Sequence, residues 1–283
     1  MTSLRKNTTH RTNWEVQAIF KIGLHTRDLP LLNALRSYWG NIGSINKSGT
    51  GLMVYRVSSM KDLAIIIDHF TRYPLVTQKR ADFELFKRVV DIKESGRHTT
   101  LVGLQEILNI RASMNKGLTE ELNIAFPKTI PVVRPLVSET DQIIPDPYWV
   151  AGFVSGEGNF SIGITKSPNS KIGYSAQLRF KLTQHSRDQF IMRSFVTYWG
   201  SGSYYQYPDK YLGDYRCVNF VDIYGKLLPF FKKYPILGVK ALGFDYFCLG
   251  AEIIESKAHL TPEGLARLRN LKKGMNKGRK WSI

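Results

Sequence analysis

The chain of 283 residues has few cysteines, few acidic residues and no long apolar run. Its two cysteines, Cys217 and Cys248, are far apart in sequence, which argues against a disulfide framework and against a cysteine-based zinc site. Apolar stretches such as residues 63–67 are far shorter than the ~18 residues needed to cross a bilayer. The first ten residues lack the apolar core of a secretory signal. These absences predict a soluble, intracellular protein without a membrane segment.

The scarcity of acidic residues gives the chain a strong positive charge. Lys and Arg number 40 against 23 Asp and Glu, so the formal net charge is +17. A hydrophobic content of 43% is enough to build a core, which excludes a disordered basic tail. A folded protein with this charge is expected to bind a polyanion, either nucleic acid or an anionic membrane surface.

The sequence contains an internal repeat. The segment FKIGLHTRDLPLLNALRSYWG, which begins at Phe20, returns as FKLTQHSRDQFIMRSFVTYWG from Phe180, at an offset of 160 residues. One residue is then inserted, and the match continues at an offset of 161, where Tyr73 corresponds to Tyr234. A repeat of this length is too long for a solenoid unit and predicts two pseudo-symmetric domains.

Prolines mark the connection between the two copies. Five of the twelve prolines fall within 21 residues, a composition typical of linkers. We predict a first copy at residues 1–117, a linker at 118–146 and a second copy at 147–283. From residue 265 to the end there are seven Lys or Arg residues and no acidic residue, which fits either a solvated tail or an arm that contacts phosphate.

Each copy is predicted to combine half-exposed strands with helices. Apolar and polar residues alternate over 160–165 and 176–183, as in antiparallel strands with one polar face. A helix is expected after Asp188, two further strands near 203–207 and 215–221, and helices near 241–255 and 263–273. The predicted order of strand, strand, helix, strand, strand, helix, helix belongs to the α+β class.

A short helix is predicted before the second copy. Asp146 and Pro147 form a helix-start signal and open the segment YWVAGFVSGEGNF. Gly152 and Gly156 are four residues apart, so one face of this helix would let another backbone approach closely. The counterpart of Glu157 in the first copy would lie before Met1, so we expect the first copy to begin within its first strand.

The segment VAGFVSGEG resembles the nine-residue motif of the LAGLIDADG homing endonucleases, and the duplication resembles their single-chain members. The resemblance covers nearly the whole chain. The TQK and GVK segments, which end at Lys79 and Lys240, resemble those of fungal organellar members. It implies two αββαββα units that form a saddle of two antiparallel sheets over DNA, the first unit lacking its N-terminal motif helix. It also implies a monomer that acts in mitochondria on a double-stranded DNA target.

The resemblance assigns catalytic roles to a few residues. In the family each motif helix ends in an acidic residue that binds Mg²⁺, and in this sequence only Glu157 can take that role, with the carbonyl of Gly156 beside it. Gln184, Lys79 and Lys240 match the polar and basic positions around the metals.

These residue types suit phosphodiester hydrolysis. Divalent cations bridge the attacking water and the leaving oxygen, and Mg²⁺ accepts one or two carboxylates together with phosphate oxygens. A nearby lysine can stabilise the extra phosphate charge. In the first copy Leu24 stands where Gln184 would have its partner, and one acid is lacking. We therefore expect cleavage by this chain to be impaired.

Polar positions on the predicted strands and near the N-terminus are expected to contact DNA bases and phosphates. These are Arg5, Lys6, Gln17, Lys21, Arg56, Gln177, Arg179, Lys181 and Arg216.

Other interpretations stay open. Some relatives act as RNA-splicing cofactors (maturases) without nuclease activity, and a DNA-binding remnant would carry the same charge. A Gly-Glu-Gly sequence after a helix is, taken alone, commonly a C-cap and turn. Lys79 and Lys240 could be ordinary surface lysines. His25 and His185 recur in the repeat, and we expect a structural role for both because each precedes a helix start.

Overall fold

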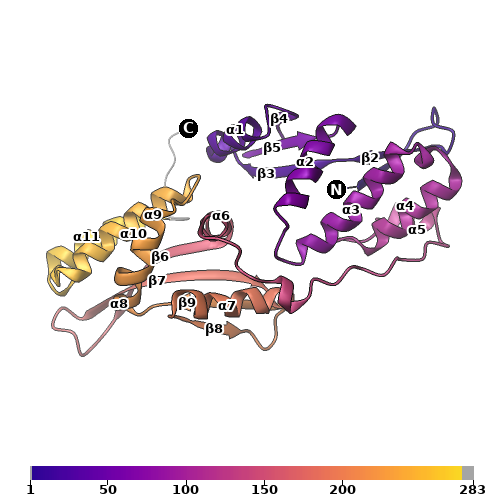
Figure 1. Cartoon of the computed structure of the whole chain (residues 1–283). Helices are drawn as coiled ribbons and strands as arrows, with labels where there is room; N and C mark the ends of the chain where they lie inside the picture. Colours follow the sequence, from indigo (N-terminus) through magenta and orange to yellow (C-terminus); the bar gives the residue numbers. More distant parts are fainter. Residues whose placement is uncertain (1, 276–283) are drawn as a thin grey trace. The chain divides into compact units, whose positions relative to one another are not determined.

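The computed structural model describes residues 2–275, and the chain divides after Asp141 into two compact units (Figure 1). The boundary lies within the Pro-rich segment 118–146. Each unit combines antiparallel strands with helices, which confirms the predicted α+β class. Over residues 2–275, no helix has the length and apolar character needed to span a membrane.

The second unit contains a four-stranded antiparallel sheet in the order β6-β7-β9-β8. Its strands are β6 (Gly158–Lys166), β7 (Tyr174–His185), β8 (Ser203–Gln206) and β9 (Leu212–Cys217). Its longer helices are α6 (Pro147–Glu157), α7 (Gln189–Trp199), α10 (Lys240–Glu255) and α11 (Pro262–Lys273). A further helical segment comprises α8 (Phe220–Asp222), the π-helical turn η5 (Ile223–Leu227) and α9 (Leu228–Lys233).

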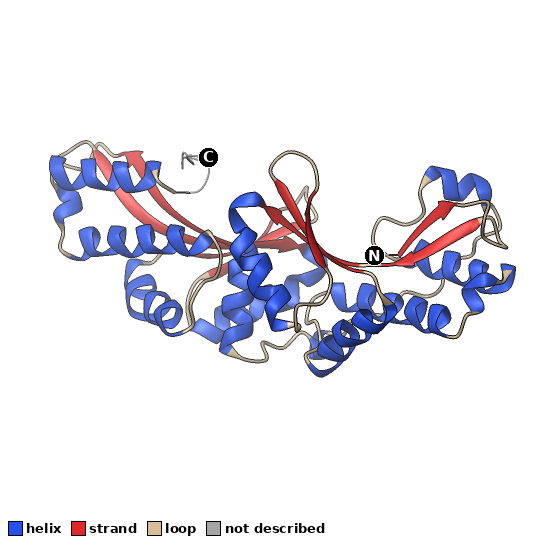
Figure 2. Cartoon of the chain, turned by 90° about the horizontal axis from the view of Figure 1, so that it is seen from above, coloured by secondary structure: helices blue, strands red, loops and turns tan. Residues whose placement is uncertain are grey.

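The first unit repeats this order from its first strand onward. Its strands are β1 (Thr2–Lys6), β2 (Trp14–Ala18), β3 (Phe20–His25), β4 (Ser44–Lys47) and β5 (Leu52–Val57). Its helices are α1 (Leu29–Tyr38), α2 (Met60–Arg72), α3 (Lys79–Glu94), α4 (Leu101–Ser113) and α5 (Glu120–Ala125). The long strand β7 corresponds to β2 and β3 together, which are separated at Ile19; Figure 2 shows the strands in red and the helices in blue.

The repeat extends to the pairing of individual residues. Phe20 lies opposite Val57 in the β3–β5 pair, and Phe180 lies opposite Cys217 in the β7–β9 pair. Both partners are shifted by the same 160 positions that relate the two sequences. The β3–β5 and β7–β9 pairs are therefore built on one register, because equivalent residues face the core in each.

Phe180 and Phe20 lie in equivalent aromatic clusters. Their partners are Trp199, Tyr215 and Phe231 for Phe180, and Trp39, Tyr55 and Phe70 for Phe20. Phe180 is fully buried and also stacks on Phe160 of β6, with ring centroids 5.0 Å apart. Phe20 is half-buried, and within the described part of the first unit no residue takes the place of Phe160.

The second copy has one residue more than the first in this region, and the π-helical turn accommodates it. Helix α2 is continuous, whereas its counterpart contains η5 between α8 and α9. A π-helical turn closes i→i+5 hydrogen bonds and so holds one residue more than an α-helical turn. The insertion widens the helix locally, and α10 keeps the position that α3 has in the first unit, at an offset of 161.

The predicted strand over 215–221 is wrong beyond Cys217. The Asn219 side chain accepts hydrogen bonds from the backbone N–H groups of Val221 (2.9 Å) and Asp222 (3.5 Å) and so caps a helix. Ser59 caps α2 in the first unit in the same way. Side-chain caps of this kind favour helix at the point where a strand ends. Each copy of the repeat thus contains, directly after its last strand, a helical segment that the predicted order lacks.

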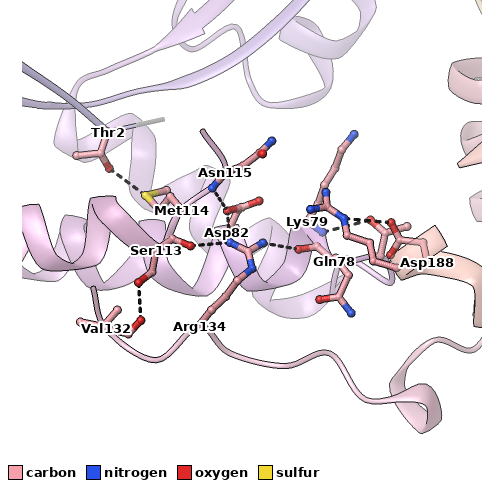
Figure 3. Close-up of polar contacts among 12 residues, drawn as sticks. Thr2, Gln78, Lys79, Asp82, Ser113, Met114, Asn115, Val132, Arg134 and Asp188 are labelled. Carbon is pink, nitrogen blue, oxygen red and sulfur yellow. Dashed lines mark hydrogen bonds and ion pairs between the residues drawn. The ribbon is translucent and has the colours of Figure 1, made fainter. Parts of the chain in front are cut away.

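Most of the Pro-rich segment 118–146 packs on the first unit and is not an unattached linker between the two copies. Leu122 of α5 is buried in the core of that unit. Figure 3 shows Arg134, whose guanidinium donates to the carboxylate of Asp82 (2.7 Å) and to the carbonyl oxygens of Ser113 (2.9 Å) and Gln78 (3.2 Å). These bonds fix the segment to α3 and to the end of α4.

The aromatic clusters generate a stability prediction. Phe180→Ala should lower the free energy of unfolding of the second unit by about 3–5 kcal/mol, because it removes a fully buried ring. Phe20→Ala, the matched variant in the first unit, should cost less because Phe20 already contacts solvent. Urea denaturation followed by circular dichroism measures both losses. Equal losses in the two variants would contradict the difference in packing.

Candidate functional site

Helix α6 begins at a strong cap and ends without a loop. Oδ1 of Asp146 accepts hydrogen bonds from the N–H groups of Tyr148 (2.8 Å) and Trp149 (3.0 Å), and Pro147 occupies the first turn. The helix ends at Glu157 and β6 begins at the next residue, Gly158. The exposed Glu157 carboxylate is therefore held at the negative end of a helix, where a cation is favoured.

The two faces of α6 differ in burial. Val150, Ala151 and Val154 are buried in the second unit. Gly152 and Gly156 are exposed, and a Cβ atom built on either glycine would meet no described atom within 4 Å. The rest of the second unit therefore leaves the face of small residues predicted for this helix uncovered.

Lys240, the first residue of α10, caps the C-terminal end of α6. Its Nζ donates hydrogen bonds to the carbonyl oxygens of Gly156 (2.8 Å) and Val154 (3.2 Å). The Val154 carbonyl also accepts a hydrogen bond from the N–H of Gly158, so the ammonium group adds a second donor at the last turn of the helix and places positive charge beside Glu157. A carbonyl oxygen has two lone pairs, so that of Gly156 can still accept a second partner. The structure thus brings together three residues that the sequence singled out, Lys240, Gly156 and Glu157.

Gln184 lies near the same helix end by strand register. Gly158 pairs with Leu182, so β7 continues past the start of β6 and carries Gln184 alongside the end of α6. Gln184 pairs with Gly213 on its other side and is half-buried. Its side-chain amide can supply either an oxygen acceptor or N–H donors at this position.

The oxygen atoms at the end of α6 are suitable ligands for a hard cation. Glu157, the Gly156 carbonyl and Gln184 offer oxygen atoms, which Mg²⁺ prefers, rather than the nitrogen or sulfur ligands typical of zinc. Among the described residues there is no group of three or more His, Cys, Asp or Glu that could hold a metal ion. A single carboxylate leaves the remaining positions of an octahedral ion to water and phosphate oxygens, a ligand set that Mg²⁺ accepts.

The first unit has a cavity beside Lys79, at the position that corresponds to the start of β6 in the second unit. Lys79, the counterpart of Lys240, lines a cavity of about 520 Å³ whose apolar wall includes Phe20, Phe70 and Phe83. In the second unit the counterparts of these rings contact Phe160 of β6; they are Phe180, Phe231 and Phe244. The cavity therefore marks the place that the start of β6 occupies in the second unit. Leu24 is half-buried near this core and provides no polar group.

One face of the sheet in the second unit is polar, as the alternation predicts. Leu178 and Phe180 are buried, whereas the intervening Gln177, Arg179 and Lys181 are exposed or half-exposed. This confirms the predicted strand and its orientation toward the core.

The remaining positions expected to contact DNA also lie on strands. Lys181 of β7 faces Arg216 of β9 across the sheet. The equivalent pair in the first unit is Lys21 and Arg56. Gln17 lies on β2, and Arg5 and Lys6 lie on β1, which pairs with β2.

Asp214 is a charged residue of this polar face that sequence reasoning missed. It is fully buried, and its carboxylate is bonded to Thr183, Tyr207 and Arg216. The repeat gives no signal for it, because Val54 occupies the equivalent position in the first unit. Alternation alone predicts that a polar residue of a strand faces solvent. Its burial follows only from the side chains that pack around it in the folded protein.

The two repeated histidines have the structural role expected for them. Nδ1 of His25 accepts a hydrogen bond from the N–H of Arg27 (3.3 Å), and Nδ1 of His185 accepts one from Arg187 (3.2 Å). Each histidine therefore caps the short 3₁₀ turn that precedes a helix.

The basic C-terminal segment begins within a helix. Residues 265–273 belong to α11, where the Arg269 guanidinium lies 4.5 Å from the ring centroid of Tyr174. Residues 276–283 lie outside the described part of the chain.

Comparison with known proteins identifies relatives along the whole chain. The sequence profile of the LAGLIDADG endonuclease family matches residues 1–90 and 150–249. The probable intron-encoded endonucleases 3 and 2 of Neurospora crassa are 42% and 36% identical over 92% and 96% of this chain. The chain spans only 49% and 61% of their own lengths. An uncharacterized 50.9 kDa protein in ND4 intron 1 of Podospora anserina is 42% identical over 35% of this chain and 22% of its own length.

Solved structures match the fold closely. The LAGLIDADG homing endonuclease I-SmaMI bound to cleaved DNA has a TM-score of 0.96 and 43% sequence identity, over 99% of this chain and 93% of that one. I-SmaMI bound to an uncleaved DNA target in the presence of calcium ions has a TM-score of 0.94 and 43% identity, over 98% and 94% of the two chains. With both halves of the repeat matched by the family profile, the chain belongs to the LAGLIDADG endonuclease family.

Proposed function

We propose that this protein is a site-specific, intron-encoded DNA endonuclease that binds double-stranded DNA and hydrolyses phosphodiester bonds with the help of Mg²⁺. The observation that carries the proposal is the end of α6, where an exposed carboxylate, a lysine ammonium and a helix C-terminus meet beside a polar sheet face. The relatives support it, because I-SmaMI was solved on cleaved DNA and, with calcium, on uncleaved DNA.

Each residue at the end of α6 takes a distinct role in this proposal. Glu157 and the Gly156 carbonyl would hold Mg²⁺, and Gln184 would orient a ligand water or a phosphate oxygen. A bound Mg²⁺ ion supplies a Lewis acid that stabilises negative charge on phosphate oxygens. Lys240 places a positive charge at the same point and can compensate charge that develops on phosphate. Lys79 has the corresponding role in the first unit.

The cellular location of the protein is inferred from its relatives, and its oligomeric state from the repeat. A relative encoded in an ND4 intron supports a mitochondrial location. Both copies of the repeat lie in one chain, so we infer that a single chain binds both halves of a DNA site, as a monomer. The residues proposed to contact DNA occupy equivalent strands in the two units, which suits a long target read by two sheets.

Affinity for duplex DNA should fall steeply with salt. Lys and Arg contacts to phosphate release condensed counterions, so the logarithm of the binding constant should decrease linearly with the logarithm of the salt concentration. Titration of a duplex library with a randomised segment at several salt concentrations measures this slope, with intron RNA as the parallel probe. A flat dependence would contradict phosphate binding, and clear preference for the RNA would favour the splicing role over the nuclease.

Cleavage should require a second motif helix in the first unit. A polypeptide limited to residues 1–283 offers Glu157 in the second unit and, in the first unit, the apolar cavity beside Lys79. By the register of the repeat, residues 146–160 grafted directly before Met1 would place a second phenylalanine beside Phe20 and a second glutamate near Lys79. The grafted chain should cut both strands with Mg²⁺, whereas residues 1–283 alone should cut poorly.

The matched control is the grafted chain with Glu157→Gln, which keeps the packing and removes one carboxylate. It should bind the target and fail to cut both strands, as read from plasmid linearisation after addition of Mg²⁺. Efficient double-strand cleavage by residues 1–283 alone would show that another acid completes the site, and the assignment of Glu157 and its counterpart would be wrong.

A further inference from the structure

The polar face of the second sheet contains a buried carboxylate. Asp214 of β9 is 0% exposed, although its strand neighbours on that face are partly open to solvent. Oδ1 accepts a hydrogen bond from Thr183 (2.7 Å), and Oδ2 accepts hydrogen bonds from Tyr207 (2.7 Å) and from Arg216. The Lys181 ammonium lies 3.5 Å from the same oxygen.

Asp214 and two tyrosines hold the Arg216 guanidinium in one orientation. Nε and Nη2 of Arg216 donate to Oδ2 of Asp214 at 3.1 and 2.8 Å, and Nη2 also donates to the Tyr207 hydroxyl. The guanidinium carbon lies 5.1 Å from the ring centroid of Tyr205 and 5.5 Å from that of Tyr207, within range of cation–π attraction. We call these four side chains, Asp214, Arg216, Tyr205 and Tyr207, the arginine clamp.

The clamp leaves one nitrogen of the guanidinium, Nη1, available. Arginine has five N–H donors, and three of them are used by Asp214 and Tyr207. In residues 2–275 nothing accepts a hydrogen bond from Nη1, and 39% of the Arg216 side chain is exposed. The two N–H groups of Nη1 are therefore presented to solvent from a fixed position on the strand.

Charge within the clamp favours this arrangement. Burial acts to raise the pKa of the Asp214 carboxyl, but hydrogen bonds from Tyr207, Arg216 and Thr183 outweigh it, and the pKa lies below its ordinary value. The carboxylate stays ionised and is covered, so it does not repel phosphate directly. With Arg216 and Lys181 beside it, the cluster has a net positive charge.

The first unit provides an internal comparison, because it lacks the clamp. Arg56 is the counterpart of Arg216, and Val54 replaces Asp214. Nη2 of Arg56 donates one hydrogen bond, of 3.3 Å, to the side chain of Gln17. The same strand position thus presents a loosely held arginine in one unit and an oriented one in the other.

We propose that Asp214 is a positioning residue that aims Arg216 at a guanine in the major groove and so sets base specificity for the second unit. The inference rests on the proposed DNA-binding function. Guanine offers two acceptors, O6 and N7, on its major-groove edge, and arginine is their commonest partner. An oriented planar donor gains most from a target with fixed geometry, whereas a mobile lysine can also bind a phosphate as a point charge.

Selection from a duplex library with a randomised segment tests the inference. The wild-type chain should enrich a sequence with a guanine at one position, and Asp214→Asn should lower that preference about tenfold while others persist. The slope of affinity against salt should not change, because no phosphate contact is lost. Tyr207→Phe, which keeps the ring and removes one hydroxyl, should lower the same preference less. Asp245→Asn, which makes the same charge change at an exposed residue of α10 in the same unit, is the matched control and should leave that preference unaffected.

Each result has a distinct meaning. A uniform loss of affinity over all sequences, with a shallower salt slope, would assign Arg216 to phosphate and overturn the inference. Unchanged base preference in Asp214→Asn, with wild-type enrichment intact, would also overturn it and leave the proposed function standing. If circular dichroism shows that Asp214→Asn does not fold, Tyr207→Phe decides the matter. Absence of enrichment and of salt-dependent binding in the wild type would overturn the proposed function itself.

Discussion

The direct junction of α6 and β6 at Gly158 is the constraint on which the candidate site depends. A Cβ atom at this position would lie 2.7 Å from the carbonyl oxygen of Val154, so only glycine allows the helix to pass into the strand without a loop. The next element starts at once, and Gly158 pairs with Leu182. Glu157 is therefore fixed between two rigid elements, and Lys240 can reach the last carbonyls of the helix from α10.

In the duplicated fold, the residues that pack in the core are repeated, whereas residues on the polar faces of the strands differ between the two copies. Trp39 and Trp199 contact Phe20 and Phe180 in the same way, because a core position must keep its volume and shape. On the polar face no such constraint applies, and Val54 is replaced by Asp214. One register can thus present different side chains in its two halves, which suits a target whose halves differ in sequence.

Much of this arrangement could be predicted from alternation and from the repeat, since strands β6 and β7 show the period of two that a half-buried sheet demands. The helix after β9 could not be predicted so easily. Its π-helical turn breaks the 3.6-residue period, and its only clear signal is the cap residue Asn219. The burial of Asp214 depends on Arg216, two residues further along β9, and on Tyr207, which the turn between β8 and β9 brings over it. No local pattern encodes the contact with Tyr207.

Charge at the end of α6 links metal binding to DNA binding in the proposed reaction. One carboxylate and a helix C-terminus, equivalent to about half a negative charge, attract a cation, whereas the Lys240 ammonium beside Gly156 opposes it. We therefore expect the free protein to hold Mg²⁺ only weakly. Phosphate oxygens of bound DNA add both negative charge and ligands. Since such coupling is reciprocal, the cation should strengthen DNA binding by the same factor by which DNA strengthens cation binding.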